Sequence, residues 1–352
     1  MALGAAVAQA TIGRRIGRRA ILLGAVLGTL PDLDVLIRYA DAVDSFTRHR
    51  GFSHSLFVLS LVSLPLGVLL RRLLDRGGQA SAGLWWFATW AVLITHALLD
   101  GFTGYGTQLF WPLPVPPVGI ASIFIIDPLY TVPLLVGLVL AWRWGGHQGR
   151  RGQPGQSAER GQRANMIGLV LAQSWLMCTL VLQQVAQTQA MAALHEQSLE
   201  TQSIKVLPFP LGVLWRVVAT DGDDVLEGWI SLIDERDDIR FDRIPRDLAQ
   251  LEELALYPPV QRLRWFTQDL VSVRMIDDAL VMTDLRIGTA AQPVFAFDVA
   301  ERVSGEFEPM LTRARQPNIT LDDMMWLLQG LGGASIDPPQ SGVAGQRRDL
   351  AL

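Results

Sequence analysis

Cysteine and charge are both scarce in this chain. One cysteine, Cys178, among 352 residues excludes an intrachain disulfide and any cluster of cysteine metal ligands. Only 18% of the residues are charged and 50% are hydrophobic, which is too apolar for an average soluble domain of this size. The formal net charge is −4 and no block of basic residues is present, so we expect no nucleic-acid partner. This composition indicates a protein whose partner is the lipid bilayer.

Five apolar stretches approach or reach the roughly 20 residues that a helix needs to cross a bilayer. We predict spans at residues 20–37, 55–70, 84–99, 120–142 and 166–182. The first of them is the weakest, because Pro31 and two aspartates shorten it. Gly24 and Gly28 give this stretch a face of small residues that is suited to close helix packing.

Most arginines near the predicted spans lie in segments on one side of the membrane. They precede the first span and fill the connections between the second and third and between the fourth and fifth, whereas residues 101–126 contain no lysine or arginine. Cytoplasmic loops carry an excess of basic residues, so we expect the three arginine-bearing segments in the cytoplasm. Arg38, Arg48 and Arg50, in the first outer loop, are the exceptions. Five spans then place the C-terminal part of the chain on the outer side.

Three of the five histidines lie with aspartates at the outer ends of these spans. Ionisable side chains next to lipid are costly, so several of them at one depth indicate a functional site. Imidazole and carboxylate groups are the ligands of zinc and of other first-row divalent ions. We therefore predict a site for a divalent ion, with Zn²⁺ as the expected ion, from six residues: Asp32, Asp34, His49, His54, His96 and Asp100.

The spacing of these residues leaves alternatives open. His96 and Asp100 are four apart, so a helix presents both on one face, either to a metal or to each other as a hydrogen-bonded pair. Asp32 and Asp34 point the same way if the segment after Pro31 is extended, although such a pair also occurs in solvated turns.

Three further residues are candidates for substrate binding or catalysis. Arg48 and Arg50 flank His49 and could hold phosphate oxygens with their forked guanidinium groups, or anchor lipid headgroups. Asp127 precedes a proline, and helix capping alone explains that pair, but Asp127 also stays a candidate for the site. In the enzyme interpretation Asp100, Arg50 and Asp127 are the catalytic candidates.

The composition changes after the fifth span. Residues 214–220, 225–234, 271–276, 280–287 and 294–299 have the alternation of β-strands. Helical segments are predicted at residues 248–256 and 321–328, the latter after Thr320 as N-cap. The fold class is therefore an α-helical membrane bundle followed by an outward-facing, mainly antiparallel β-rich domain. We expect the domains at residues 1–190 and 204–330, and a disordered tail at residues 331–352.

At the residues described above, the sequence resembles the YdjM-like membrane-bound metal-dependent hydrolases. The resemblance runs through residues 24–34, 49–55, 95–100, 107–112 and 124–130, and extends to residues 214–218 and 283–286. It implies a multi-pass protein of the bacterial inner membrane. The His and Pro-Asp pattern is also similar to that of zinc-dependent phospholipases C and related zinc nucleases, which implies phosphoester chemistry.

These observations favour a membrane-bound hydrolase in which water activated by the metal attacks an ester. Arg50 would steady a phosphate-like oxyanion, and a site at the depth of one leaflet favours a lipid or lipid-linked substrate. The alternative is a metal-binding membrane protein without enzymatic activity, either structural or a transporter. A transporter needs polar groups in both halves of the membrane, and the sequence has no matching inner cluster.

Overall fold

The computed structural model describes residues 1–75, 77–144, 156–233, 239–289 and 293–316. The chain divides into two compact units. The first contains residues 1–37, 48–120 and 125–179, and the second contains residues 38–47, 121–124 and the chain from residue 180 onward.

The first unit is helical. Within the part of the chain that the structure describes, three helices are long and apolar enough to cross a membrane, and two shorter ones are also apolar. Five spans therefore remain a prediction. The helices are α1 (Ala2–Thr11), α2 (Gly13–Ile16), α3 (Arg19–Leu27), α5 (Leu56–Leu74), α6 (Ala82–Gly101) and α7 (Pro128–Trp144), with short 3-10 helices η1 (Pro31–Leu36) and η2 (Phe52–His54). Helix α8 (Gln156–Glu196) belongs to this unit as far as Thr179 and to the second unit beyond it.

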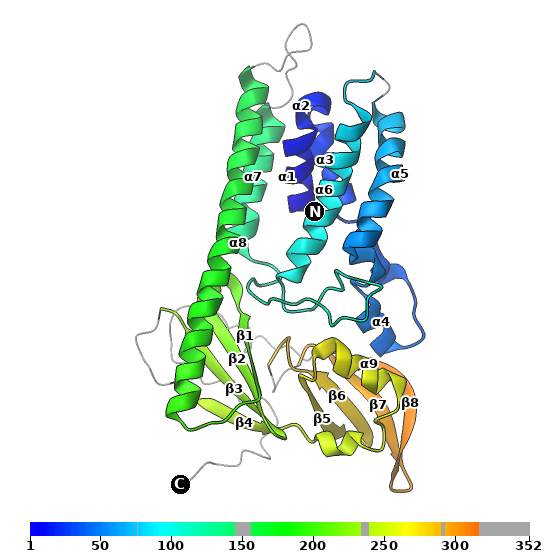
Figure 1. The fold of residues 1–352 in the computed structure, drawn as a ribbon, viewed down its shortest axis with the longest axis vertical. Helices are drawn as coiled ribbons and strands as arrows, with labels where there is room; N and C mark the ends of the chain where they lie inside the picture. The colour runs from blue at the N-terminus through cyan, green and yellow to red at the C-terminus, as the bar shows by residue number, and fades with distance from the viewer. Residues whose placement is uncertain (76, 145–155, 234–238, 290–292, 317–352) are drawn as a thin grey trace. The chain divides into compact units, whose positions relative to one another are not determined.

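The prediction of one span over residues 20–37 is wrong. Helix α3 ends at Leu27, and the chain turns there before η1 begins at Pro31, whose ring cannot continue a helix. Instead α3 packs antiparallel to α1, as Figure 1 shows. The close packing predicted for Gly24 and Gly28 is confirmed, because a Cβ at Gly24 would overlap the Gly4 carbonyl oxygen.

Helices α7 and α8 are a second closely packed pair. A Cβ built at Gly137 would lie 2.9 Å from the Ala164 carbonyl oxygen, so only glycine permits this approach. Helix α8 also contacts α1 through side-chain amides: Asn165 donates to the Ala6 carbonyl oxygen at 2.9 Å and Gln162 to that of Ala10 at 3.1 Å. The Gln162 bond satisfies a carbonyl group in the last turn of the short helix α1, and the Asn165 bond adds a second contact at Ala6 inside that helix.

The arginine-bearing segments of the first unit meet at one end of the bundle. Figure 1 shows α2 at this end, at the level of the last turns of α5 and α7. The Arg18 guanidinium donates to the Arg143 carbonyl oxygen at 3.2 Å and lies over the Trp142 ring. The helices thus separate their basic ends from the ends that carry the predicted site.

The second unit contains two four-stranded antiparallel sheets, which confirms the predicted antiparallel β-rich region. Both sheets have their strands in chain order. The strands are β1 (Ser203–Pro208), β2 (Leu214–Asp221), β3 (Asp224–Ser231) and β4 (Phe241–Pro245), then β5 (Val271–Ile276), β6 (Ala279–Asp284), β7 (Ala296–Val303) and β8 (Glu306–Arg315). The other elements are α4 (Ala42–Arg48), η3 (Pro210–Gly212), η4 (Leu248–Leu251) and α9 (Pro258–Thr267).

The first sheet is covered on both faces. Trp215 and Val217 pack with Ala186 and Ala190 of α8, and Val218 belongs to a separate buried cluster. The prediction of a helix at residues 248–256 is wrong. Within that range η4 forms one short turn, and the helix α9 begins only at Pro258, where proline suits the first helical position. The predictions for residues 320–328 and for the tail lie outside the described residues.

Candidate metal centre

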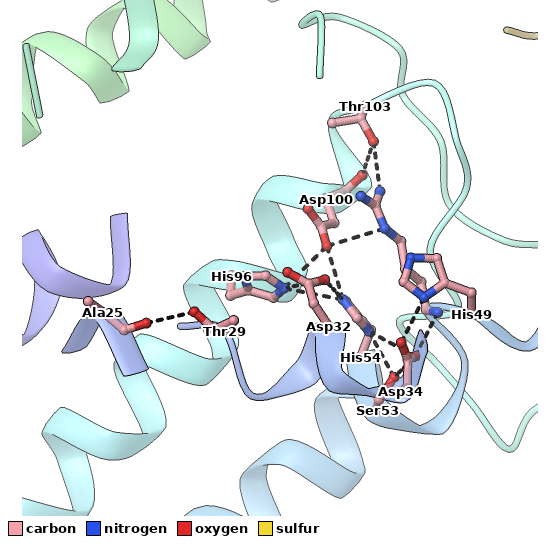
Figure 2. Close-up of polar contacts among 11 residues, drawn as sticks. Ala25, Thr29, Asp32, Asp34, His49, Ser53, His54, His96, Asp100 and Thr103 are labelled. Carbon is pink, nitrogen blue, oxygen red and sulfur yellow. Dashed lines mark hydrogen bonds and ion pairs between the residues drawn. The ribbon is translucent and has the colours of Figure 1, made fainter. Parts of the chain in front are cut away.

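Four of the six predicted ligands come together in the first unit. Asp32 comes from η1, His54 from η2, and His96 and Asp100 from the last turns of α6. One ligand atom from each lies within 4.8 Å of the others, and the group could bind a metal ion. Figure 2 shows the four side chains pointing toward one another.

Five of the six distances among these four atoms are close to those between the ligands of a zinc ion. The two Nε2 atoms of His54 and His96 are 3.2 Å apart. Asp100 Oδ2 lies 3.0 Å from the first and 3.4 Å from the second, and Asp32 Oδ1 lies 3.4 Å from each. Ligands about 2.05 Å from a zinc ion in tetrahedral geometry are about 3.4 Å from one another, so this donor set fits zinc.

The Asp100 carboxylate gives a second reason to expect a cation. Its Oδ2 atom is buried and accepts no well-directed hydrogen bond from the described residues, although it faces His54 and His96. An unsatisfied buried carboxylate oxygen is costly. A divalent ion at the centre of the group would satisfy this oxygen and balance the two carboxylates.

Asp34 and His49 form a separate pair beside the group. The prediction that Asp32 and Asp34 point the same way is wrong, because η1 is a 3-10 helix, in which residues two apart point in different directions. Asp34 Oδ1 lies 2.7 Å from His49 Nδ1 instead. Its Oδ2 accepts hydrogen bonds from the Ser53 hydroxyl and from the Arg50 backbone N–H, the latter at 3.0 Å.

Ser53 connects Asp34 to one ring of the group. An ionised carboxylate only accepts, so the Ser53 hydroxyl donates its single hydrogen to Asp34. Ser53 Oγ also lies 2.9 Å from His54 Nδ1, and it must accept there from an Nδ1–H group. In the neutral ring Nε2 then carries the lone pair, which points to the other three residues. This is the arrangement that orients metal-binding histidines.

The surroundings keep both η1 carboxylates ionised. Burial raises the pKa of Asp32, but hydrogen bonds and charge from His54 and His96 outweigh it, so the pKa lies well below its usual range. Burial likewise raises the pKa of Asp34, and the bonds from His49 and Ser53 lower it further than burial raises it. Burial lowers the pKa of His54, yet Asp100 and Asp32 raise it above its ordinary value.

Arg50 reaches the group from an unusual backbone conformation. Its φ of 59° is in the left-handed region, which is uncommon for a residue with a side chain. Its Nε atom lies 3.5 Å from Asp100 Oδ2, and Nη1 donates to Thr103 Oγ1 at 3.2 Å. The guanidinium also lies 5.0 Å from the centre of the Tyr105 ring. A fixed cation therefore borders the group.

The family of this chain follows from its first half. Residues 1–190 match the sequence model of the family described as YdjM inner membrane protein. The chain belongs to the YdjM inner membrane protein family. The family resemblance predicted from the motifs is thereby confirmed, and all the residues of the candidate metal centre lie within the matched part of this YdjM-family chain.

Two other comparisons add less. The uncharacterized protein YfhP of Bacillus subtilis (strain 168) is 25% identical over 131 residues. That alignment covers 37% of this chain and 39% of YfhP, so the chain spans well under half of that relative. No solved structure matches the YdjM-family chain.

Asp127 lies apart from the metal-binding group. Its Oδ1 accepts from the backbone N–H groups of Leu129 and Tyr130, at 2.9 and 3.1 Å, and from Trp175 Nε1 at 3.0 Å. It therefore caps α7, as the Asp-Pro pair alone explained, and the structure does not bring it to the site.

Sequence reasoning missed the role of Ser53. Nothing in the sequence distinguishes Ser53 from its neighbour Ser55, which caps α5 by accepting from the Val58 N–H group at 3.3 Å. Thr103 and Tyr105, which contact Arg50, were not predicted as members of the site either. Only the proximity of Thr103 to Asp100 in the sequence could have indicated it.

Proposed function

We propose that this YdjM-family chain is a membrane-bound metal-dependent hydrolase that cleaves an ester or phosphoester of a lipid or lipid-linked substrate. The observation that carries the proposal is the set of two imidazoles and two carboxylates whose ligand atoms all lie within 4.8 Å of one another, with an arginine beside them. Asp32, His54, His96 and Asp100 would hold the ion, which we propose to be Zn²⁺. A bound zinc ion supplies Lewis acidity, which lowers the pKa of water and stabilises negative charge on a substrate oxygen.

The protein residues around the ion have distinct roles in this proposal. Asp34 and Ser53 hold the His54 ring with its lone pair toward the ion. Arg50 is placed to bind a phosphate or carboxylate oxygen of the substrate, since its guanidinium already lies 3.5 Å from the Asp100 carboxylate. His49, held by Asp34, has its ring centre 6.2 Å from that of His54 and could accept or donate a proton at Nε2.

The group has one open side. The Asp32 side chain is 44% exposed, whereas that of His54 is fully buried. Next to Asp32 in η1, the apolar residues Leu33, Val35 and Leu36 are 47%, 70% and 74% exposed. Exposed apolar side chains beside a polar site suit the acyl chains of a lipid, which is the support for a lipid substrate.

We also propose the orientation. The basic end of the first unit faces the cytoplasm and the metal centre faces the outer side of the inner membrane, because cytoplasmic segments carry the excess of Lys and Arg. Replacing the first span by the α1–α3 pair does not change this, since Arg14–Arg19 stay at the basic end and Asp32 at the other.

One experiment tests the function directly. Purified protein in detergent is analysed for bound metal and assayed for release of phosphate or headgroup from lipid phosphoesters, with and without chelator. We expect about one zinc per chain, loss of metal in His54→Ala and His96→Ala, and loss of turnover in Asp100→Asn. His195→Ala, in the part of α8 outside the group, is the matched control and should keep both.

The same experiment separates the alternative. The second candidate is a membrane protein whose metal ion is structural and which has no enzymatic activity. The number of ligands supports it, because zinc ions bound by four protein ligands are typically structural. Metal that depends on His54 and His96, together with turnover indifferent to chelator and to Asp100→Asn, would overturn the hydrolase and leave the structural ion. Full metal content in both histidine variants would overturn the site.

A further inference from the structure

The loop that follows α6, drawn in teal in Figure 1, carries a tip of seven consecutive apolar residues. Residues 110–116, here called the apolar tip, have the sequence Phe-Trp-Pro-Leu-Pro-Val-Pro, and all of them are exposed. Phe110, Trp111 and Val115 are each 41% exposed, and Leu113 is 53% exposed. A loop that lies in water presents polar side chains, whereas an uninterrupted run of exposed apolar ones indicates a surface with an apolar partner.

The loop around the apolar tip carries no charged side chain. Residues 101–126 contain no aspartate, glutamate, lysine or arginine, although 18% of the whole chain is charged. Charged side chains are costly next to lipid, so a segment that lies there has to be free of them. The composition of this loop therefore fits a lipid environment better than an aqueous one.

The backbone of the apolar tip also presents few free N–H groups. Three of its seven residues are prolines, which have no N–H group. The Trp111 N–H group donates to the Gln108 carbonyl oxygen at 3.1 Å, and the Leu113 N–H group donates to that of Phe110 at 2.9 Å. Unsatisfied backbone groups are the main reason why irregular segments avoid lipid. Five of the seven residues of the tip present no unsatisfied N–H group, so this cost is small.

The base of the apolar tip is fixed at the first turn of α5. The Leu56 N–H group donates to the Leu109 carbonyl oxygen at 2.9 Å, and Ser55 Oγ donates to that of Trp111 at 2.6 Å. Helix α5 has 19 residues, which at about 1.5 Å each nearly equal the roughly 30 Å thickness of the hydrocarbon layer. In a span of this length the first turn lies at the boundary between lipid tails and headgroups, and so does the base of the tip.

The apolar tip continues the outer face of α5. Phe57 and Leu61, near the start of this helix, are 55% and 70% exposed, as lipid-facing side chains of a span are. Phe52 is 39% exposed, and its ring centre lies 6.3 Å from that of Trp111. The chain belongs to a family of inner membrane proteins, so the bilayer is the partner that covers the face of α5. This continuity favours the same partner for the tip.

We propose that the apolar tip lies in the lipid leaflet at the metal-centre end of α5, with Trp111 at the level of the headgroups. The partner is the bilayer itself, because an uncharged tip contacts acyl chains and selects no headgroup by charge. Ser55, which bonds the tip, directly follows His54 of the metal centre, so the tip keeps that centre close to headgroup depth. A lipid ester would reach it there laterally, and this last consequence alone rests on the proposed function.

Fluorescence quenching of the full-length protein in lipid nanodiscs tests the position of the tip without any assay of activity. Cys178→Ser removes the natural thiol, and Leu113→Cys then carries an environment-sensitive fluorophore. The discs contain phosphatidylcholine and phosphatidylglycerol, and both of their faces meet water. Lipids with a doxyl group on the acyl chain quench from the lipid side, and iodide quenches from the water side.

Two further cysteine variants are the matched controls in the same unit. Leu61→Cys marks the lipid-facing side of α5, and Gln79→Cys marks an exposed position in the loop before α6. We expect doxyl lipids to quench the fluorophore at Leu113→Cys about as strongly as at Leu61→Cys. Iodide should quench it severalfold less than at Gln79→Cys. Val115→Cys, another exposed position of the tip, gives the same measurement if Leu113→Cys does not fold.

Two outcomes would overturn the proposal. Iodide quenching at the tip equal to that of Gln79→Cys would place the tip in water. Protection of the tip from both quenchers would mean that protein covers it, either the β-sheet unit or a second copy of the chain. Loss of hydrolase activity or of bound metal has no bearing on either outcome, so a failure of the proposed function is recognised separately.

Discussion

Replacing Ser53 with alanine should weaken metal binding without unfolding the protein. The Ser53 hydroxyl is the link between the Asp34 carboxylate and His54 Nδ1. Without it, the Nδ1–H group of a ring with a fully buried side chain loses its acceptor. A buried polar group left without a partner costs about 1–3 kcal/mol. The ring can escape this cost by rotating or changing its tautomer, and either change turns the Nε2 lone pair away from the ion.

The expected size follows from that cost. A loss of about 1–3 kcal/mol in the metal-binding conformation corresponds to roughly a tenfold to hundredfold loss of zinc affinity. Competition with a chromophoric chelator measures this affinity in detergent. Ser53→Thr keeps the hydroxyl and should restore most of it.

Ser55→Ala is the matched control for this prediction. Ser55 lies two residues away, caps α5 and donates to the Trp111 carbonyl oxygen at 2.6 Å, but it contacts none of the four ligands in the described structure. Its loss should lower thermal stability by about 1 kcal/mol and leave zinc affinity unchanged. Equal zinc affinity in Ser53→Ala and the unaltered protein would refute the assignment of the His54 tautomer and of Ser53 as its support.

Three further predictions concern other parts of the chain. Gly24→Ala should lower the midpoint of thermal unfolding, because its Cβ would overlap the Gly4 carbonyl oxygen, whereas Gly83→Ala, with open space around it, should not; equal midpoints would contradict the α1–α3 packing. Reporter fusions after Arg151 should be cytoplasmic and fusions after Thr220 exported, and an exported signal at Arg151 would overturn the orientation. Burial and the Arg286 charge lower the pKa of Lys205, the single lysine, from 10.5 to about 8. The folded chain therefore binds this proton more weakly than the unfolded chain, so the free energy of unfolding should rise with pH between about 8 and 10.5, and Lys205→Met should remove that rise.

Local sequence determined the longest apolar helices and several of the strands. The apolar stretches after residues 55 and 84 are long enough to predict α5 and α6, and alternation predicted β2, β3 and β5 to within a few residues. The four-residue spacing of His96 and Asp100 placed both on one face of α6, and the structure agrees, with 3.4 Å between Nε2 and Oδ2. These features depend on neighbours a few residues apart, which a sequence displays directly.

The tertiary structure alone decided which carboxylate joins which histidine. Both η1 aspartates looked equivalent in the sequence, but the 3-10 turn after Pro31 directs Asp32 to His54 and His96, and Asp34 to His49. The direction of a side chain in an irregular turn depends on backbone angles that packing sets, and those contacts come from residues far away in the chain.

The same holds for the segment that precedes the site. Nothing in residues 42–48 predicted a helix, because α4 is short and its stability comes from Phe46 among three phenylalanines more than 200 residues further along. Arg50 takes a left-handed conformation for a related reason: Asp34 and Gln108, distant in sequence, bond its N–H and carbonyl groups. Sequence therefore determined which residue types reach this end of the helices, and long-range packing decided how they are aimed.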